Sequence, residues 1–223
     1  MKNFIVLIGS FFFISCSVNT KIVDRPVIFD DERELLTLQY MQERYGIESK
    51  STTIEPKMIV LHWTSIPTLH KTFEAFEQSK ISSQRPDIKN ASALNVSAQF
   101  VVDQDGTIYR LMPETTMARH VIGLNHCAIG IENVGGTKEK PLTKAQLKAN
   151  IRLVKYLASK YSIDYLIGHY EYTNFVDHEL WLEKDAGYRT EKTDPGKDFL
   201  ENVKKGAKKF NFKTTPSTKI SEI

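Results

Sequence analysis

The sequence predicts a single-domain α/β fold in which helices flank a mixed β-sheet. Short apolar runs at 58–61 and 165–169 have the length and composition of strands buried on both faces. They alternate with amphipathic helical segments, and an Asp105-Gly106 turn between two β-rich runs predicts an antiparallel hairpin. A hairpin combined with strand-helix alternation indicates parallel and antiparallel pairs in one sheet.

The composition is that of one globular domain. The chain has 223 residues, of which 41% are apolar and 26% are charged. A formal net charge of +3 is too small to indicate nucleic-acid binding, and we expect none. Two cysteines without C-x-x-C spacing exclude a disulfide scaffold and a thiolate zinc site, so histidines and carboxylates must hold any metal. We expect a monomer.

Residues 1–15 predict a signal peptide. The apolar run at 4–14 is shorter than the roughly 20 residues that span a bilayer. It ends at Phe13-Ile14-Ser15-Cys16, which resembles a bacterial lipobox, so we expect lipid on Cys16 and a lipid-anchored tether over 16–30. An ordinary signal peptide with an incidental cysteine is the alternative. Both interpretations predict export to the bacterial cell envelope. For a lipoprotein we expect the periplasmic face of the outer membrane, although the sequence leaves the choice between inner and outer membrane open.

Residues 31–54 predict a leading helix followed by a loop. The helical pattern opens with acidic residues at Asp31, and Gly46 is placed to end it. A second helix is expected over 67–80, beginning with a proline that a first helical turn tolerates. Residues 82–95 are polar and predict a loop.

The central part of the chain predicts three strands. Residues 98–103 and 107–111 are the two arms of the hairpin. Residues 127–132 alternate, so two isoleucines share one face and Ala128, Gly130 and Glu132 share the other. Because Ala128 and Gly130 have very small side chains, we expect open space next to the Glu132 carboxylate on this face of the strand.

The last part of the chain combines two helices with a long loop. Thr143 and Gln146 have capping-box spacing, which predicts the start of an amphipathic helix. Residues 170–193 have a loop-like composition, a second helix is expected over 198–208, and residues 211–223 predict a disordered tail.

Four polar residues that could take part in chemistry lie at the ends of predicted strands or just before a predicted helix. His62 and His169 end two buried strands, where neighbouring strands of one sheet can bring them within a few ångströms. In Lys192-Thr193-Asp194-Pro195, strand-like alternation points Lys192 and Asp194 in the same direction. Each residue alone is more often structural than functional.

The ordered set of motifs resembles a family, over about residues 55–205. Its members are zinc-dependent N-acetylmuramoyl-L-alanine amidases of the amidase-2 type, which are related to peptidoglycan recognition proteins. The motifs are MIVLHWT at 58–64, NVSAQFVVDQDGTIYRL at 95–111, ARH at 118–120, AIGIENVGG at 128–136, IGH at 167–169 and KTDPG at 192–196. The resemblance implies an amidase catalytic domain over 55–210.

The resemblance also implies a site. It assigns zinc to His62, His169 and Asp194, and the catalytic side chains to Glu132 and Lys192. Such a ligand set leaves the fourth tetrahedral position of zinc open, which is typical of a catalytic site. The substrate would be peptidoglycan or a muropeptide, cleaved between N-acetylmuramic acid and L-alanine.

Four further residues are expected to contact the substrate: Trp63, Gln99, His120 and Asn133. Gln99 departs from the histidine that many family members have at its position, which puts that contact in doubt. The long 170–193 segment is expected to form a wall of the groove.

Two other functions remain open from the sequence. A binding module would keep the groove without cutting, and a cysteine hydrolase would use Cys127. Within the long loop, Asp177 and His178 are alternative metal ligands. His70 and His126 are expected to be surface residues. The lysines at 204, 205, 208 and 209 are expected to form a solvated helix face.

Overall fold

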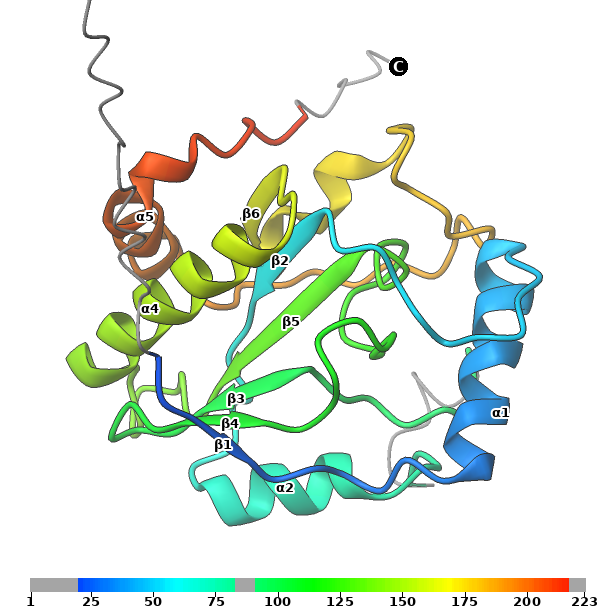
Figure 1. Cartoon of the computed structure of the whole chain (residues 1–223), viewed down its shortest axis with the longest axis horizontal. Helices are drawn as coiled ribbons and strands as arrows, with labels where there is room; N and C mark the ends of the chain where they lie inside the picture. The colour runs from blue at the N-terminus through cyan, green and yellow to red at the C-terminus, as the bar shows by residue number, and fades with distance from the viewer. Residues whose placement is uncertain (1–19, 83–90, 217–223) are drawn as a thin grey trace, which may run out of the picture.

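The computed structural model describes residues 20–82 and 91–216 (Figure 1). The predicted signal peptide and the lipidation residue Cys16 lie outside the described residues. So do the last seven residues of the chain and part of the predicted polar loop, at 83–90.

A six-stranded sheet forms the centre of the molecule, in the order β1-β4-β3-β5-β2-β6. The strands are β1 (Ile22–Asp24), β2 (Met58–Leu61), β3 (Phe100–Val102), β4 (Ile108–Arg110), β5 (Ala128–Asn133) and β6 (Tyr165–Gly168). β3 and β4 are antiparallel and all other neighbours are parallel. This confirms the predicted mixed sheet, including the hairpin whose turn contains Gly106 at φ 85°.

The register of the three central parallel strands determines which residues meet at their carboxyl ends. Leu61 of β2 pairs with Ile131 of β5 on one side and with Gly168 of β6 on the other. The next residue on each strand is therefore Glu132, His62 or His169. Because side chains alternate along a strand, these three point to the same face of the sheet.

Helices α4 (Lys144–Lys160) and α5 (Lys197–Gly206) cover the opposite face. Their apolar residues pack with Ile59, Leu61 and Ile131 in the largest buried cluster. The predicted capping box is present, since the Thr143 hydroxyl accepts from the Gln146 N–H and the Gln146 side chain accepts from the Thr143 N–H. The start of α4 is thereby fixed as predicted.

Two further helices lie on the side of the site. Helix α1 (Asp31–Tyr40) continues into the π-helical turn η1 (Met41–Tyr45) and ends at Gly46, which has φ 70°. Helix α2 (Leu69–Glu77) is capped by Thr68. Arg33 of α1 is buried, and its guanidinium donates to the carbonyl oxygens of residues 76, 77 and 78 at the end of α2. This contact fixes the two helices to each other.

Two predicted boundaries are wrong. The tether predicted over 16–30 contains strand β1, which pairs in parallel with β4 at the edge of the sheet. The tail predicted from residue 211 begins too early, since Phe212 stacks with Phe210 and packs against the main core. Both segments are short and lack a clear hydrophobic period, so the sequence did not predict either contact.

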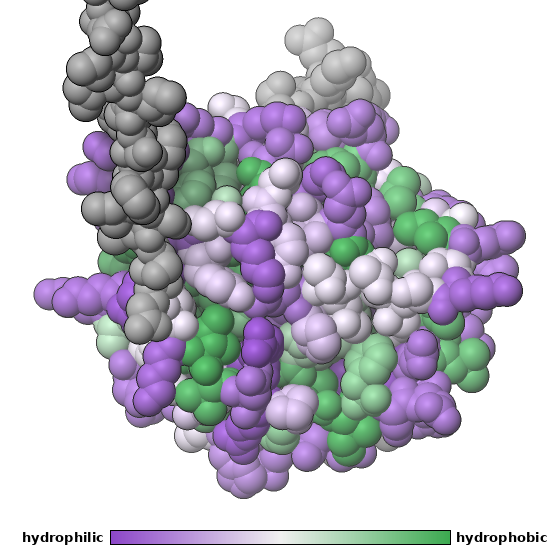
Figure 2. All heavy atoms as spheres, in the orientation of Figure 1, coloured by the Kyte–Doolittle hydropathy of each residue, from purple (hydrophilic) through white to green (hydrophobic). Residues whose placement is uncertain are grey.

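Two short 3₁₀ helices complete the described chain: η2 (His169–Phe175) directly after β6, and η3 (Lys208–Phe210) after α5. The visible face in Figure 2 is mostly hydrophilic, with scattered apolar residues. Within residues 20–82 and 91–216, no helix combines the length and apolar character needed to cross a membrane.

The cap of α4 gives a stability prediction. Thr143→Ala removes the acceptor for the Gln146 N–H and the donor to the Gln104 carbonyl oxygen. The free energy of unfolding should fall by about 1 kcal/mol, measured by urea denaturation. Lys148→Ala, an exposed change in the same helix, is the control and should change it by less than about 0.5 kcal/mol. Equal values for the two variants would contradict the role of the cap.

Candidate active site

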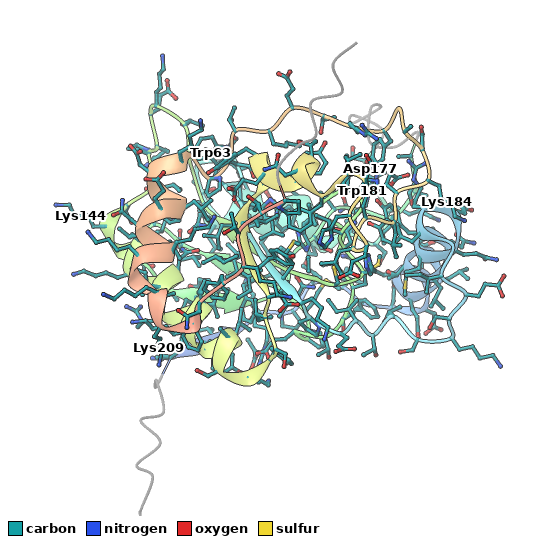
Figure 3. The ribbon with its side chains drawn as sticks, turned by 90° about the horizontal axis from the view of Figure 1, so that it is seen from above. Trp63, Lys144, Asp177, Trp181, Lys184 and Lys209 are labelled. Carbon is teal, nitrogen blue, oxygen red and sulfur yellow. The ribbon has the colours of Figure 1, made fainter. Side chains whose placement is uncertain are left out.

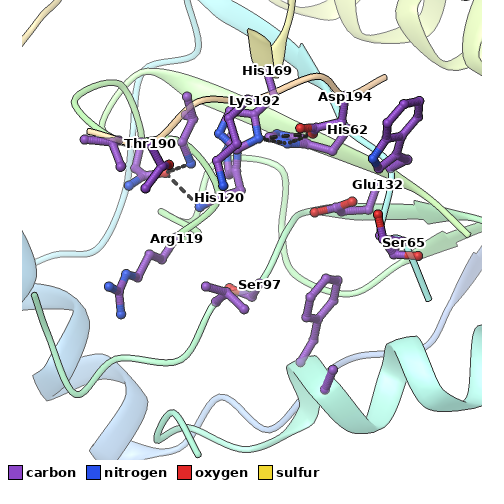
Figure 4. Close-up of a pocket in the computed structure, with 18 of the residues that line it drawn as sticks. His62, Ser65, Ser97, Arg119, His120, Glu132, His169, Thr190, Lys192 and Asp194 are labelled. Carbon is purple, nitrogen blue, oxygen red and sulfur yellow. Dashed lines mark hydrogen bonds and ion pairs between the residues drawn. The ribbon is translucent and has the colours of Figure 1, made fainter. Parts of the chain in front are cut away.

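Three side chains from three segments converge above the carboxyl ends of the central strands. His62 follows β2, His169 follows β6, and Asp194 lies in the loop before α5. The Nδ1 atoms of the two histidines are 3.0 Å apart, and Asp194 Oδ2 lies 3.2 Å from His62 Nδ1 and 3.1 Å from His169 Nδ1. The structure thus brings together the three residues that the sequence predicted as ligands (Figure 4).

All three residues are buried, and the ionisation of His169 and of Asp194 is shifted accordingly. Burial lowers the pKa of His169 to about 4, assisted by the neighbouring His62 ring. Burial alone would raise the pKa of Asp194, but hydrogen bonding with the histidines, first with His169, outweighs it and holds that pKa well below its usual range. The group at neutral pH is therefore a carboxylate beside an uncharged His169 imidazole.

The donor set fits a zinc ion. Zinc takes imidazole nitrogen and carboxylate oxygen at about 2.0–2.2 Å, which separates two tetrahedral ligand atoms by about 3.3 Å. The three separations of 3.0, 3.1 and 3.2 Å are close to that value. Two nitrogens and one oxygen leave one position for water or substrate, the pattern of catalytic zinc sites.

A hollow of about 800 Å³ opens beside the three residues. Glu132 and Lys192 line it together with His62, His169 and Asp194, as the sequence predicted. Figure 4 shows Glu132 and Lys192 on different sides of the hollow, with Asp194 and His62 near both. A carboxylate and an amine thus share one cavity with the candidate metal ligands.

His120 also lines the hollow, but its ring is engaged within the protein. Its Nδ1 is 3.0 Å from His62 Nε2, and its Nε2 is 3.3 Å from the Ala128 carbonyl oxygen. The ring lies over Gly130, where an added Cβ would be 2.8 Å from two ring carbons. The open space predicted above the small residues of β5 is therefore filled by His120 at Gly130.

Two predicted substrate contacts are wrong. Gln99 is fully buried, accepts from the Gly130 N–H and donates to the Thr116 carbonyl oxygen, so its role is to join β3 to β5 and to the loop after β4. Asn133 is also fully buried and donates to the His62 carbonyl oxygen, on the face of β5 opposite to Glu132. Neither side chain lines the hollow.

Trp63 is placed where it can contact a ligand. It lines the hollow and also a second groove of about 650 Å³, which continues past Pro195 and the start of α5. Figure 3 shows Trp63 beside that end of α5. An added Cβ at Gly136 would be 2.3 Å from the indole, so this glycine allows the ring to lie against the backbone.

The cysteine-hydrolase interpretation does not fit the structure. Cys127 is 3% exposed, does not line the hollow, and its Sγ–H donates to the Leu124 carbonyl oxygen at 3.5 Å. Burial raises the pKa of the Cys127 thiol to about 12. A nucleophilic thiolate needs the opposite environment.

Neither of the alternative ligands in the long loop lines the hollow. His178 Nδ1 accepts from the Leu180 N–H, and its Nε2 lies 3.4 Å from the Tyr165 hydroxyl. Asp177 is exposed at φ 69°. Part of the loop does form a wall of the hollow as expected, through Tyr188 and Thr190.

The predictions of surface exposure for the remaining histidines and for the lysines have different outcomes. His70 is exposed, as predicted, and pairs with Glu74. His126 is half-buried and not exposed as expected: its ring packs against Tyr45, and burial lowers its pKa to about 4. The predicted lysine face is largely solvated, with Lys204 lying 3.5 Å from Glu171.

Sequence reasoning missed two residues that shape the site. Tyr40 reaches the hollow from α1, a helix for which the sequence gave no functional sign. Asn125 is fully buried and accepts from the backbone N–H groups of His120 and Val121. A single asparagine in a loop offers no pattern from which that contact could be predicted.

Comparison with known proteins identifies one family that matches most of the chain. A family model described as N-acetylmuramoyl-L-alanine amidase matches residues 38–197. Residues in this range include His62, His120, Glu132, His169, Lys192 and Asp194. The match therefore covers most of the sheet and the whole candidate site.

Individual relatives agree with the family match. The chain is 33% identical over 95 residues to peptidoglycan recognition protein 3 of Mus musculus, covering 40% of this chain and 26% of that protein. It is 30% identical over 106 residues to the endolysin of Escherichia phage T7, covering 44% and 70%. The solved structure of the N-acetylmuramoyl-L-alanine amidase LysC from Clostridium intestinale has 25% identity and a TM-score of 0.50, covering 86% of this chain and 99% of that chain.

The buried histidines predict a pH-dependent stability. In the metal-free protein, burial holds the pKa of His126 and of His169 at about 4, against 6.5 in the unfolded chain. Between these values the unfolded state binds more protons, so the free energy of unfolding should fall as the pH is lowered from 6.5 to 4. Urea denaturation at about pH 7, 5.5 and 4.5 measures this.

His126→Gln should reduce the loss without abolishing it, since it removes one such group and leaves His169 and His120, whose pKa burial also lowers. His70→Gln is the matched control, because His70 is exposed, and it should leave the loss unchanged. A free energy of unfolding that stays constant across this pH range would contradict the prediction.

Proposed function

The chain belongs to the N-acetylmuramoyl-L-alanine amidase family, and we propose that it hydrolyses the amide bond between N-acetylmuramic acid and L-alanine with a zinc ion held by His62, His169 and Asp194. The observation that carries the proposal is the convergence of two Nδ1 atoms and one carboxylate oxygen within 3.2 Å of one another. The donors come from three separate segments and all adjoin one hollow.

Zinc, when bound, would lower the pKa of a water molecule towards about 7 and polarise the scissile carbonyl group. The carboxylate of Glu132 is the general base in this proposal. It accepts a proton from the attacking water and then delivers it to the nitrogen of the leaving L-alanine. Its place in register beside His62 supports this role, because the sheet itself sets the distance between the base and the candidate metal ligand.

Lys192 is assigned to the charge that develops on the carbonyl oxygen. Its ammonium group lines the same hollow as Glu132, and only Thr193 separates it from Asp194 in sequence. A cation beside the scissile carbonyl group would stabilise the oxyanion that forms there. In this proposal Glu132 therefore transfers the proton, and Lys192 stabilises the negative charge on the oxygen.

The substrate has a sugar on one side of the scissile bond and a peptide on the other, so a site must accommodate both. The main hollow and the second groove meet at Trp63, next to the candidate ligands. We assign Trp63 to substrate contact, since an indole ring offers a flat apolar surface to a sugar ring or a peptide side chain.

We propose that the protein is exported and anchored in the bacterial envelope through lipid on Cys16, on the periplasmic face of the outer membrane. The lipobox-like Phe13-Ile14-Ser15-Cys16 supports this proposal. Anchoring would hold the enzyme near peptidoglycan, its proposed substrate. The other cysteine, Cys127, is buried and offers no site for a lipid.

Substitutions in the site separate zinc binding from catalysis. Asp194→Ala should lose both zinc and activity, because it removes a proposed ligand. Glu132→Gln should keep zinc and lose about 10²–10⁴-fold in rate, because it removes the general base. Mass spectrometry of defined MurNAc-peptide fragments measures release of the free L-alanine terminus, and elemental analysis measures bound zinc.

Glu74→Gln, an exposed change on α2, is the control and should keep full activity. Full activity in Glu132→Gln would remove that residue from the mechanism. Absence of cleavage by the zinc-loaded natural sequence, with fragments and with whole sacculi, would overturn the amidase proposal in favour of binding.

The lipid proposal has a separate test. In a Gram-negative host, the full chain should fractionate with membranes, whereas Cys16→Ser should not, because it lacks the thiol to be acylated. Cys127→Ser is the matched control and should remain membrane-bound. Unchanged attachment of the Cys16→Ser protein would contradict lipidation at this residue.

A further inference from the structure

We infer that His120 is a positioning residue for the metal centre, which holds the His62 imidazole with Nδ1 directed at His169 and Asp194. The inference rests on the proposed function, because it concerns the ligands of the same zinc site. It assigns His120 a role inside the protein instead of the substrate contact expected from the sequence.

The hydrogen bonds of the two rings determine which nitrogen carries the proton. His120 Nε2 lies 3.3 Å from the Ala128 carbonyl oxygen, which can only accept, so this nitrogen carries the hydrogen. In an uncharged imidazole the other nitrogen is then an acceptor. His120 Nδ1 therefore accepts from His62 Nε2 at 3.0 Å. His62 is left with its Nδ1 lone pair available to a metal.

Hydrogen bonds of its own backbone also fix the position of His120. The backbone N–H groups of His120 and Val121 donate to Asn125 Oδ1 at 2.9 and 2.8 Å. The Asn125 amide in turn donates to the Tyr45 hydroxyl at 2.8 Å. A buried chain of hydrogen bonds thus connects the end of the N-terminal helix with His62.

Gly130 provides the space that the His120 ring occupies. A Cβ at this position would lie 2.8 Å from His120 Cγ and Cδ2 and 3.0 Å from Nδ1. Gly130 does not have a positive φ, so its backbone conformation is open to other residues. The glycine is therefore required for the ring above it and not for the strand.

The other histidine ligand, His169, differs from His62 in the contacts of its second ring nitrogen. Its Nε2 is buried without a hydrogen-bond partner among the described residues, so no contact on that nitrogen orients the ring. Both ring nitrogens of His62, by comparison, are engaged. The structure therefore places the orienting contact on one of the two histidine ligands.

Zinc affinity tests the inference without using activity. Loss of an orienting hydrogen bond to a metal ligand lowers metal affinity by about 10–100-fold. His120→Ala should therefore weaken zinc binding by that factor in competition with a chromophoric chelator. His70→Ala is the matched control, since it removes an exposed histidine, and it should bind zinc like the natural sequence.

Gly130→Ala provides a second, coupled test. Its methyl group displaces the His120 ring, so zinc affinity should fall as in His120→Ala. In the His120→Ala background the same change meets no ring and should have almost no further effect on affinity. A double-mutant cycle measures this coupling. Additive losses would contradict the idea that Gly130 acts through His120.

The tautomer of His62 gives a measurement that would not change if His120 had only a structural role. In the metal-free natural sequence, ¹⁵N NMR should show His62 protonated at Nε2, and a population protonated at Nδ1 should appear in His120→Ala. Protonation at Nδ1 in the natural sequence would overturn the inference whether or not the variants fold.

The outcomes distinguish this inference from the proposed function. Unchanged zinc affinity in a folded His120→Ala protein would remove the positioning role and leave His62, His169 and Asp194 as ligands. Failure of the natural sequence to bind zinc more tightly than His62→Ala would overturn the metal site itself, and the positioning role with it.

Discussion

The parallel register of β5, β2 and β6 is the constraint on which the site depends. Pairing of Leu61 with Ile131 and Gly168 places the next three residues side by side. Neighbouring strands lie about 4.8 Å apart, so side chains on one rung are already within reach of a common ion. A slip of one residue in either pair would turn His62 or His169 into the apolar core on the other face. The chemistry of the site and the packing of the core therefore require the same register.

Asp194 is the one candidate ligand that the sheet does not position. It is carried by the segment before α5, and its place depends on the packing of that helix against α4 and the sheet. Pro195 and Gly196 lie between this ligand and the helix, and both line the second groove with Trp63. The same short segment thus closes the ligand set and shapes the surface beside it.

Features with a short sequence period were predicted from the residues, and the grouping of His62, His169 and Asp194 was predicted from the resemblance to a family. The other long-range side-chain contacts were not predicted. Alternation in β5 correctly separated Glu132 from the isoleucines, and the capping box correctly located α4. The same alternation shows that Asn133 must face away from Glu132, so a substrate contact there was inconsistent with the pattern. Gln99 and His120 could not be interpreted from sequence, because Gln99 binds the distant Gly130 N–H and His120 binds the distant His62 ring. Strand β1 is too short to show a pattern, and only its pairing with β4 identifies it.

The N-terminal helix is part of the catalytic domain and not an appendage in front of it. Arg33 binds the last carbonyl oxygens of α2, which fixes α1 against the rest of the fold. Tyr40 then lines the hollow, and Tyr45 supports the loop that carries His120 through Asn125. A domain boundary at residue 55 would remove all of these contacts and leave the Asn125 amide without its phenol acceptor. Buried amides are costly to leave without a partner, so a chain that began there would lose support for the loop next to His62. The sheet therefore positions His62 and His169 of the candidate metal site, and the N-terminal helix supports the loop beside them.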